Sequence, residues 1–396
     1  MLQTAVIARS IGSGYCGLAA SVLLALSTIR YDKAVAGLCL LFCALHWRAG
    51  IAAFERRRGL VLATLALIAW IAALTWLRDD RISRILLSQY ASFALCFLAG
   101  LVALERVEDA ARTARIVLLF ILLLPAIFVF VPESIVQADY MKVLHPFAMQ
   151  HGRWTSIFGN ANNFGIAMAA GIGLAISLWL ERIIGGALLL TAGAIFGGQI
   201  YLSGSRNAVA TVAILSLLAA LTLLFRERPA AFGRPGPAVC AAVGVPVILL
   251  VAATTAVYFA PENHWGRSFV IPLGIRQIAW SQFPQLVLER PFTGTSAAAF
   301  LVGGPVAHGH NLALTLAVEW GLVGLGLSLC WAWQFFRAGA WTMARLIAVT
   351  PFLAGQVVDD FHYFRPFGLL AAMVAAWCVA VPPYRPTAQA PHSGDT

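Results

Sequence analysis

Residues 163–180 read NFGIAMAAGIGLAISLWL and contain no acidic or basic side chain. A helix that crosses the hydrocarbon core of a bilayer needs about 20 predominantly apolar residues. Lipid offers no hydrogen-bond partners, so a spanning segment must satisfy its own backbone amides, as a helix does. The stretch therefore predicts a transmembrane helix, and comparable stretches recur along the whole chain.

The composition extends this prediction to the complete chain. Of its 396 residues, 60% are hydrophobic and only 11% are charged, whereas about 25% of the residues of a soluble domain are charged. The apolar segments lack the alternation of membrane β-strands. We therefore predict an all-α polytopic membrane protein with about 12 transmembrane helices, at residues 11–29, 34–47, 59–77, 85–104, 116–132, 163–180, 183–202, 207–225, 237–258, 311–336, 346–358 and 367–382.

We expect one transmembrane domain, residues 1–382, followed by a disordered tail at 383–396. Two polar loops, 133–162 and 260–310, are long for a chain this apolar. Both contain short amphipathic stretches. In 275–287 the apolar side chains follow helical spacing, with polar ones on the other face, which predicts a helix in the plane of the membrane interface.

Arginine clusters predict the orientation. They are dense at 55–58, 105–115 and 226–234, and short loops rich in Lys and Arg face the cytoplasm. With segment 11–29 read as a retained helix rather than a signal peptide, both termini are cytoplasmic and both long loops lie outside. The net charge of +10 is dispersed over these loops, so we expect no nucleic-acid partner but contact with membrane lipids.

Four polar motifs all fall on the outer side of this topology, although they belong to different loops. Separate segments that meet on one face are what an assembled reaction site requires. The motifs are GRWTSIFGNANNFG (152–165), SGSRNAVA (203–210), IRQIAWSQFPQLVLERPFTGTSAAAF (275–300) and HGHNLALTLAVEWGLVGL (308–325).

Three arginines in these motifs, Arg153, Arg206 and Arg276, are candidates to bind phosphate. A guanidinium contacts two phosphate oxygens at once, and the contact strengthens where water is excluded. Helix N-termini would add partial positive charge. The residues expected to cap such helices are Asn160, Asn162, Ser203 and Ser205. Together they would suit a lipid-linked diphosphate.

The last motif supplies a candidate base. His310 titrates near neutral pH and could accept the proton of an acceptor hydroxyl. His308 is close by, and Glu319 lies within an apolar segment, where a carboxylate is costly and is usually functional. The acidic pairs 79–80 and 359–360 lack the spacing of metal ligands, so we expect neither a metal nor another cofactor.

Each residue also has a purely structural reading. A single interfacial arginine is commonly an anchor whose head group reaches water, and Arg206 could do no more than cap a helix. His310 with Asn311 could likewise only begin a helix. Trp280 is typical of aromatic residues at the interface. Glu319 has the fewest structural explanations.

In these motifs the chain resembles the superfamily of O-antigen ligases and O-antigen polymerases. That pattern begins with an Arg and a Gly-Asn-Pro-Asn-like stretch, here within 152–165 with Ala161 where Pro is common, followed by a Ser-Arg, here Ser205 and Arg206. An Arg with a Trp four residues later and a Pro-x-x-Gly turn come next. A His-Asn pair and Glu-x-Gly-x-x-Gly close the pattern, which spans about residues 150–326. These last elements are Arg276, Trp280, PFTGTS, His310, Asn311, Glu319, Gly321 and Gly324.

The resemblance implies a metal-independent, inverting glycosyltransferase of the bacterial inner membrane with a periplasmic active site. The donor would be a glycan on undecaprenyl diphosphate. The acceptor would be the lipid A core in a ligase of lipopolysaccharide biosynthesis, or a second lipid-linked glycan in a polymerase. By matching motif, Arg206, Arg276 and His310 take the catalytic roles. The supporting and substrate-binding residues would be Arg153, Asn160, Asn162, Trp280, His308, Asn311 and Glu319.

Within this class the expectation is an O-antigen ligase, with a surface-polysaccharide polymerase as the alternative. A transporter or flippase of lipid-linked sugars is the rival from another class. Such a carrier places charges and broken helices near mid-membrane, whereas here only Glu319 is clearly within an apolar segment. A non-catalytic scaffold would not require three arginines and a histidine on one side.

Overall fold

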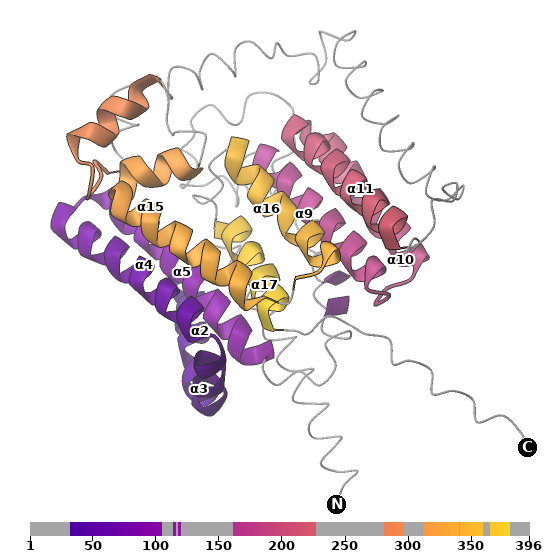
Figure 1. The fold of residues 1–396 in the computed structure, drawn as a ribbon, viewed down its shortest axis with the longest axis horizontal. Coiled ribbons are helices and arrows are strands. Elements are labelled where there is room, and N and C mark those ends of the chain that lie inside the picture. Colours follow the sequence, from indigo (N-terminus) through magenta and orange to yellow (C-terminus); the bar gives the residue numbers. More distant parts are fainter. Residues whose placement is uncertain are drawn as a thin grey trace, which may run out of the picture.

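The computed structural model describes residues 32–104, 114–115, 118–119, 161–226, 281–296, 312–339, 341–358 and 365–380. All regular secondary structure in these ranges is helical (Figure 1). Six of the helices are long and apolar enough to cross a membrane. The chain is therefore an all-α, multi-pass membrane protein.

The helices follow the predicted segments closely. They are α2 (Asp32–Leu45), α3 (Trp47–Arg56), α4 (Arg58–Arg78), α5 (Arg81–Leu104), α9 (Ala161–Leu180), α10 (Gly186–Ser203), α11 (Arg206–Arg226), α15 (Leu312–Ala338), α16 (Met343–Val358) and α17 (Arg365–Ala380). Nine of the predicted segments correspond to one of these helices, and α3 is additional. Segments 11–29 and 237–258, and nearly all of 116–132, lie outside the described residues, so a total of twelve stays a prediction.

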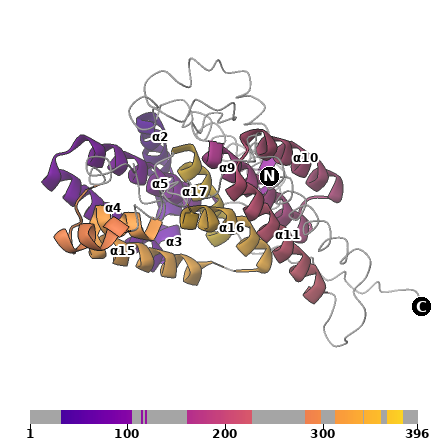
Figure 2. The ribbon, with the colours of Figure 1, turned by 90° about the horizontal axis from the view of Figure 1, so that it is seen from above.

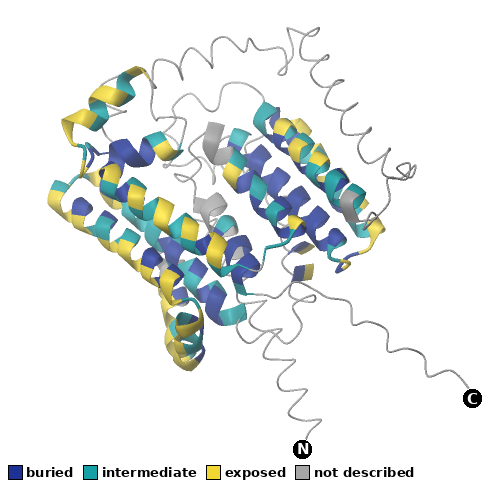
Figure 3. Ribbon diagram, viewed as in Figure 1, coloured by how far each residue is buried: buried dark blue, intermediate teal, exposed yellow. Residues whose placement is uncertain are grey.

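Helix α9 is the most deeply buried of the candidate membrane spans. Nearly every one of its residues is buried, in contrast to the exposed outer faces of α4, α10 and α11 (Figure 3). Small side chains let its neighbours approach closely. A Cβ at Gly171 would collide with the Phe196 ring of α10, and one at Gly173 would lie 3.0 Å from the Ile347 carbonyl oxygen of α16. Close packing of small residues is a common basis of helix association in membranes.

Apart from α2 and α3, the labelled helices form two groups, α4, α5 and α15 on one side and α9, α10 and α11 on the other, with α16 and α17 between them (Figures 1 and 2). Helices α4 and α15 run antiparallel. The indole of Trp70 donates to the Trp320 carbonyl oxygen at 3.0 Å, and the indole of Trp331 donates to the Thr64 hydroxyl at 2.9 Å. These bonds satisfy polar atoms that lipid would leave without partners.

Contacts between helix termini define the two ends of the bundle. At the Arg345 end, Arg345 donates to the Cys378 carbonyl oxygen at 2.9 Å and pairs with Glu181, and Arg57 donates to the Ala380 carbonyl oxygen at 3.4 Å. This end therefore contains the starts of α4 and α16 and the ends of α9 and α17. The Arg78 end, opposite, contains the end of α4 and the starts of α5, α9, α11 and α15.

This arrangement separates the arginine clusters from the polar motifs. Within the described ranges, the cluster 55–58 and the end of α11 lie at the Arg345 end, whereas the described parts of all four motifs lie at the Arg78 end. The compartment that each end faces stays a prediction.

Candidate functional site

The N-termini of α9 and α11 meet at the Arg78 end. Gly165, in the first turns of α9, packs directly against the Ser203–Ser205 turn that precedes α11. A Cβ at Gly165 would collide with the Ser205 side chain and would lie 2.9 Å from the Ser203 hydroxyl oxygen. Two helices that begin side by side direct unpaired backbone amides and the positive ends of their dipoles toward the same region.

The turn before α11 is held by its own serines. The Ser205 hydroxyl accepts a hydrogen bond from the Ala208 amide at 3.3 Å, and the Ser203 hydroxyl accepts one from the Ser205 amide at 3.1 Å. Gly204 has a φ of 59°, in the left-handed region that glycine adopts at little cost. Ser205 therefore caps α11, as predicted, and Arg206 is the half-buried first residue of that helix.

The start of α9 differs from the prediction in one respect and adds one residue. Asn162 was expected to cap the helix, but α9 begins at Ala161, so Asn162 lies inside the first turn. Asn163, which the sequence interpretation overlooked, is only 1% exposed. Among the described residues, neither its amide nitrogen nor its amide oxygen has a hydrogen-bond partner. A buried amide in this state requires an explanation, such as a bound polar group.

Glu319 lies at a break in α15. The carboxylate residue is fully buried, and two positions later Gly321 has a φ of 72° and a ψ of 179°, which interrupts the helical backbone. The break divides α15 into a first part, 312–320, and a second part that continues to Ala338. Glu319 was expected within an apolar helix and lies in α15, whereas the break was not predicted.

A turn from the third motif fills this break. Thr295 donates its amide to the Val318 carbonyl oxygen at 2.7 Å, and Leu322 donates its amide to the Pro291 carbonyl oxygen at 2.7 Å. Gly294 also has a positive φ, and a Cβ there would lie 2.5 Å from the Val318 carbonyl oxygen. Residues 290–296, named here the inserted turn, thus replace the helical hydrogen bonds that the break removes.

Arg78, the last residue of α4, holds the inserted turn from the side. Its guanidinium donates to the carbonyl oxygens of Thr293 and Gly294, the second at 3.1 Å. It lies 5.4 Å from the centre of the Trp320 ring, which is a favourable cation–π distance. Burial disfavours the charged guanidinium, the negative charges of Asp80 and Glu319 oppose this effect, and Arg290 adds a neighbouring positive charge. Arg78 therefore links the turn, the break and the buried carboxylate.

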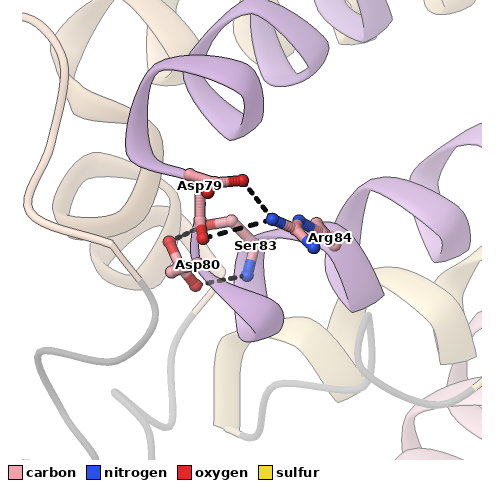
Figure 4. A network of polar contacts seen from close by, with 4 residues as sticks. All are labelled: Asp79, Asp80, Ser83 and Arg84. Carbon is pink, nitrogen blue, oxygen red and sulfur yellow. Dashed lines mark hydrogen bonds and ion pairs between the residues drawn. The ribbon is translucent and has the colours of Figure 1, made fainter.

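Asp80 fixes the other side of the inserted turn. Its carboxylate accepts hydrogen bonds from the Ser83 amide at 2.7 Å and the Ser83 hydroxyl at 2.6 Å, which caps α5 (Figure 4). It also accepts one from the Ser296 hydroxyl at 3.2 Å. Burial alone would raise the pKa of Asp80, but these hydrogen bonds and the charge of Arg78 together lower that pKa below its ordinary value of 3.8. Asp80 is thus held as a carboxylate.

The amphipathic helix predicted within 275–287 is partly within the described chain. Residues 281–289 are helical. Phe283, Leu286 and Val287 are half-buried there, while Gln285 is exposed, as the sequence pattern predicted. This short helix leads directly into the inserted turn.

Of the predicted site residues, the described chain contains Arg206, Asn162 and Glu319. All three lie at the Arg78 end, with Arg206 and Asn162 in the α9–α11 group and Glu319 in the α4–α15 group. The other predicted site residues lie outside the described chain, and they are Arg153, Asn160, Arg276, Trp280, His308, His310 and Asn311.

The function has to be argued from the residues themselves, because the comparisons with known proteins gave no match. No protein-family model matches the chain, and a search of curated protein sequences gives no significant match.

Proposed function

We propose that this protein is an inner-membrane glycosyltransferase that moves a glycan from undecaprenyl diphosphate to an acceptor hydroxyl at the periplasmic face. The observation that carries the proposal is the meeting of two helix N-termini at Gly165 and Ser205. Arg206 begins one of these helices, and the buried amide of Asn163 lies in the first turn of the other. A diphosphate matches this arrangement chemically.

Each helix N-terminus carries roughly half a positive elementary charge, and unpaired amides in the first turn donate to phosphate oxygens. A half-buried guanidinium adds a full charge with bidentate geometry. The motif resemblance adds Arg153 and Arg276 to this cradle. Such a site stabilises the negative charge that a diphosphate gains as it leaves.

The proposed reaction is a single inverting displacement. His310 accepts the proton of the acceptor hydroxyl, whose oxygen forms a bond to the anomeric carbon of the glycan. The bond between that carbon and the diphosphate oxygen breaks, and undecaprenyl diphosphate leaves with the electron pair. Glu319 supports the site from the first part of α15, which begins two residues after His310.

Within this class we propose an O-antigen ligase, whose acceptor is the lipid A core, and the alternative is a polymerase, whose acceptor is a second lipid-linked glycan. The two differ in the acceptor alone. A transporter of the same lipid-linked sugar would move its substrate without releasing undecaprenyl diphosphate. Product analysis therefore separates all three functions.

The test uses the purified protein in lipid nanodiscs with an undecaprenyl-diphosphate-linked glycan and either acceptor. Released undecaprenyl diphosphate and the glycosylated acceptor are measured by mass spectrometry. We expect transfer that Arg206→Ala abolishes and Arg206→Lys restores only in part, because an ammonium cannot form the bidentate contact. Arg182→Ala, an exposed arginine at the Arg345 end, is the control. Normal transfer by Arg206→Ala would contradict the proposed diphosphate site.

A further inference from the structure

We infer that Arg78 is a positioning residue, which locks the inserted turn (residues 290–296) into the break of α15 and thereby sets the geometry of the reaction site. The kinetic part of this inference rests on the proposed function. The geometric part rests on the contacts of Arg78, Asp80 and Gly321 alone.

The break in α15 is built to receive the turn. Gly321 adopts a φ of 72°, and a Cβ at this position would collide with the Phe292 carbonyl oxygen. The inserted turn also has a glycine at the contact. Gly294 has a φ of 72° and lies directly against the Val318 carbonyl. Two backbones therefore meet at a distance that only glycine allows on either side.

The turn is held at three points that belong to three different helices. The backbone of α15 binds it through Val318 and Leu322. Arg78 of α4 binds its carbonyl oxygens. Asp80, which caps α5, binds its last residue, Ser296. Without Arg78, the carbonyl oxygens of Thr293 and Gly294 lose this donor, and only the two flanking attachments remain.

Arginine is suited to this position. One nitrogen of its guanidinium donates to two successive carbonyl oxygens, while the ring of Trp320 lies 5.4 Å away. A lysine ammonium is a compact point charge that stacks less well on an aromatic ring. The charge also offsets Glu319 and Asp80. A lysine should therefore preserve the position of the turn only in part.

The turn connects two predicted catalytic segments. It follows the 281–289 helix, which begins five residues after Arg276, and it is bonded to α15, which begins two residues after His310. Fixing the turn on α15 therefore fixes the described 281–289 helix relative to α15, and these are the described elements nearest in sequence to the two residues. A displacement of about 1 Å at a reacting group can lower a rate by about a hundredfold.

The test exploits a pair of serines. The Ser83 and Ser296 hydroxyl oxygens lie 3.5 Å apart, so cysteines at both positions need only a small rearrangement to form a disulfide, whose S–S bond is about 2 Å long. The experiment compares S83C/S296C with R78A/S83C/S296C, each oxidised and then reduced. The 83–296 disulfide is quantified by mass spectrometry of the linked peptides, alongside kcat and KM for glycan transfer.

We expect R78A to lower kcat by about a hundredfold with little change in KM, and R78K to recover part of it. Starting from reduced protein, we expect the 83–296 disulfide to form more slowly in R78A/S83C/S296C than in S83C/S296C. Once the disulfide has formed in R78A/S83C/S296C, we expect kcat to be restored. Arg84→Ala, which removes an exposed arginine that pairs with Asp79, should transfer normally. If the oxidised triple variant stays inactive although its parent S83C/S296C is active, Arg78 acts on the substrate and the positioning role is wrong.

The experiment distinguishes failure of the proposed lock from failure of the proposed glycosyltransferase function. Cross-linking as fast with R78A as without it contradicts the lock, whatever the enzyme does. If the wild type transfers no glycan while R78A still slows cross-linking, the proposed function fails and the lock stands. If R78A fails to fold, R78K and R78Q take its place in the same two measurements.

Discussion

The guanidinium of Arg345 lies 3.4 Å from the carboxylate of Glu181, and neither side chain is more than 6% exposed. Glu181 follows the last residue of α9, and Arg345 lies in the first turn of α16. Burial raises the pKa of Glu181, although Arg345 opposes this change. The same guanidinium lies 5.3 Å from the centre of the Trp377 ring of α17. One buried cation thus aligns three helices.

Removal of Arg345 should destabilise the protein strongly. Arg345→Met leaves Glu181 buried without its partner, which typically costs about 3–5 kcal/mol. The double variant Glu181→Gln/Arg345→Met should recover most of this loss, because both charges are then gone. Thermal unfolding in detergent micelles measures the effect, and Arg182→Ala at the same end is the control. A melting temperature of Arg345→Met equal to that of the wild type would show that the pair contributes nothing.

Two glycines of α15 should respond in opposite ways to alanine. Gly321→Ala places a methyl group against the Phe292 carbonyl oxygen at a positive φ, and strained backbone of this kind costs about 1–3 kcal/mol. Gly326→Ala has open space around its Cβ and should be neutral or stabilising by up to about 1 kcal/mol. Thermal unfolding of the two variants side by side decides this. If Gly321→Ala were as stable as Gly326→Ala, the inserted turn would not occupy the break in α15.

The Asp80 cap should make the protein sensitive to acid. Asp80→Ala should cost about 1 kcal/mol, as loss of a helix cap does. Because the folded-state pKa of Asp80 is lowered below 3.8, its contribution is complete above about pH 3.8 and is lost as the pH falls through the lowered value. Unfolding measured from pH 7 downward should show a smaller acid-induced loss in Asp80→Ala than in the wild type.

Asp79→Asn is the matched control for Asp80. Asp79 pairs with Arg84 at the surface, where the side chains are 83% and 60% exposed, and exposed pairs contribute about 0–1 kcal/mol. Asparagine also tolerates the positive φ at this position. If Asp79→Asn and Asp80→Ala shift the acid transition equally, the hydrogen bonds to Ser83 and Ser296 are not its cause.

His310→Ala should abolish glycan transfer while the protein still folds and binds its donor. Base catalysis contributes about 10²–10⁴-fold, so a loss of that size is expected, with a smaller loss for His308→Ala. Transfer should survive chelators, because the sequence contains no recognisable ligand set. Full inhibition by a chelator, reversed by a divalent ion, would replace this mechanism. An active His310→Ala would mean that the histidine has only a structural role.

The helices were readable from the sequence because each is specified by local composition. Residues 163–180 lack charge, and α9 spans Ala161–Leu180. The cap of α11 was readable as well, since a serine precedes Arg206 and serine favours that position. Local rules of this kind depend on neighbours in the chain.

The inserted turn was not readable, because it depends on contacts between distant segments. Gly321 resembles the other glycines of an apolar helix until Phe292 is brought against it. Arg78 resembles an ordinary interfacial anchor. A signal for Asp80 existed, since an Asp just before an apolar run is typical of a helix start. It was overlooked because the acidic pair was considered only as a metal site.

The deep burial of α9 has a consequence for biosynthesis. Its closest partners include α16, and α5 packs similarly on α17, where a Cβ at Gly100 would lie 2.8 Å from the Ala376 Cβ. Both partners follow later in the chain, and α16 begins more than 160 residues after the end of α9. Until then, the face of α9 around Gly173 lacks its α16 partner. Helices α16 and α17 therefore close the described bundle, and a nascent chain that stops before Met343 lacks the helices that pack on α9 and α5.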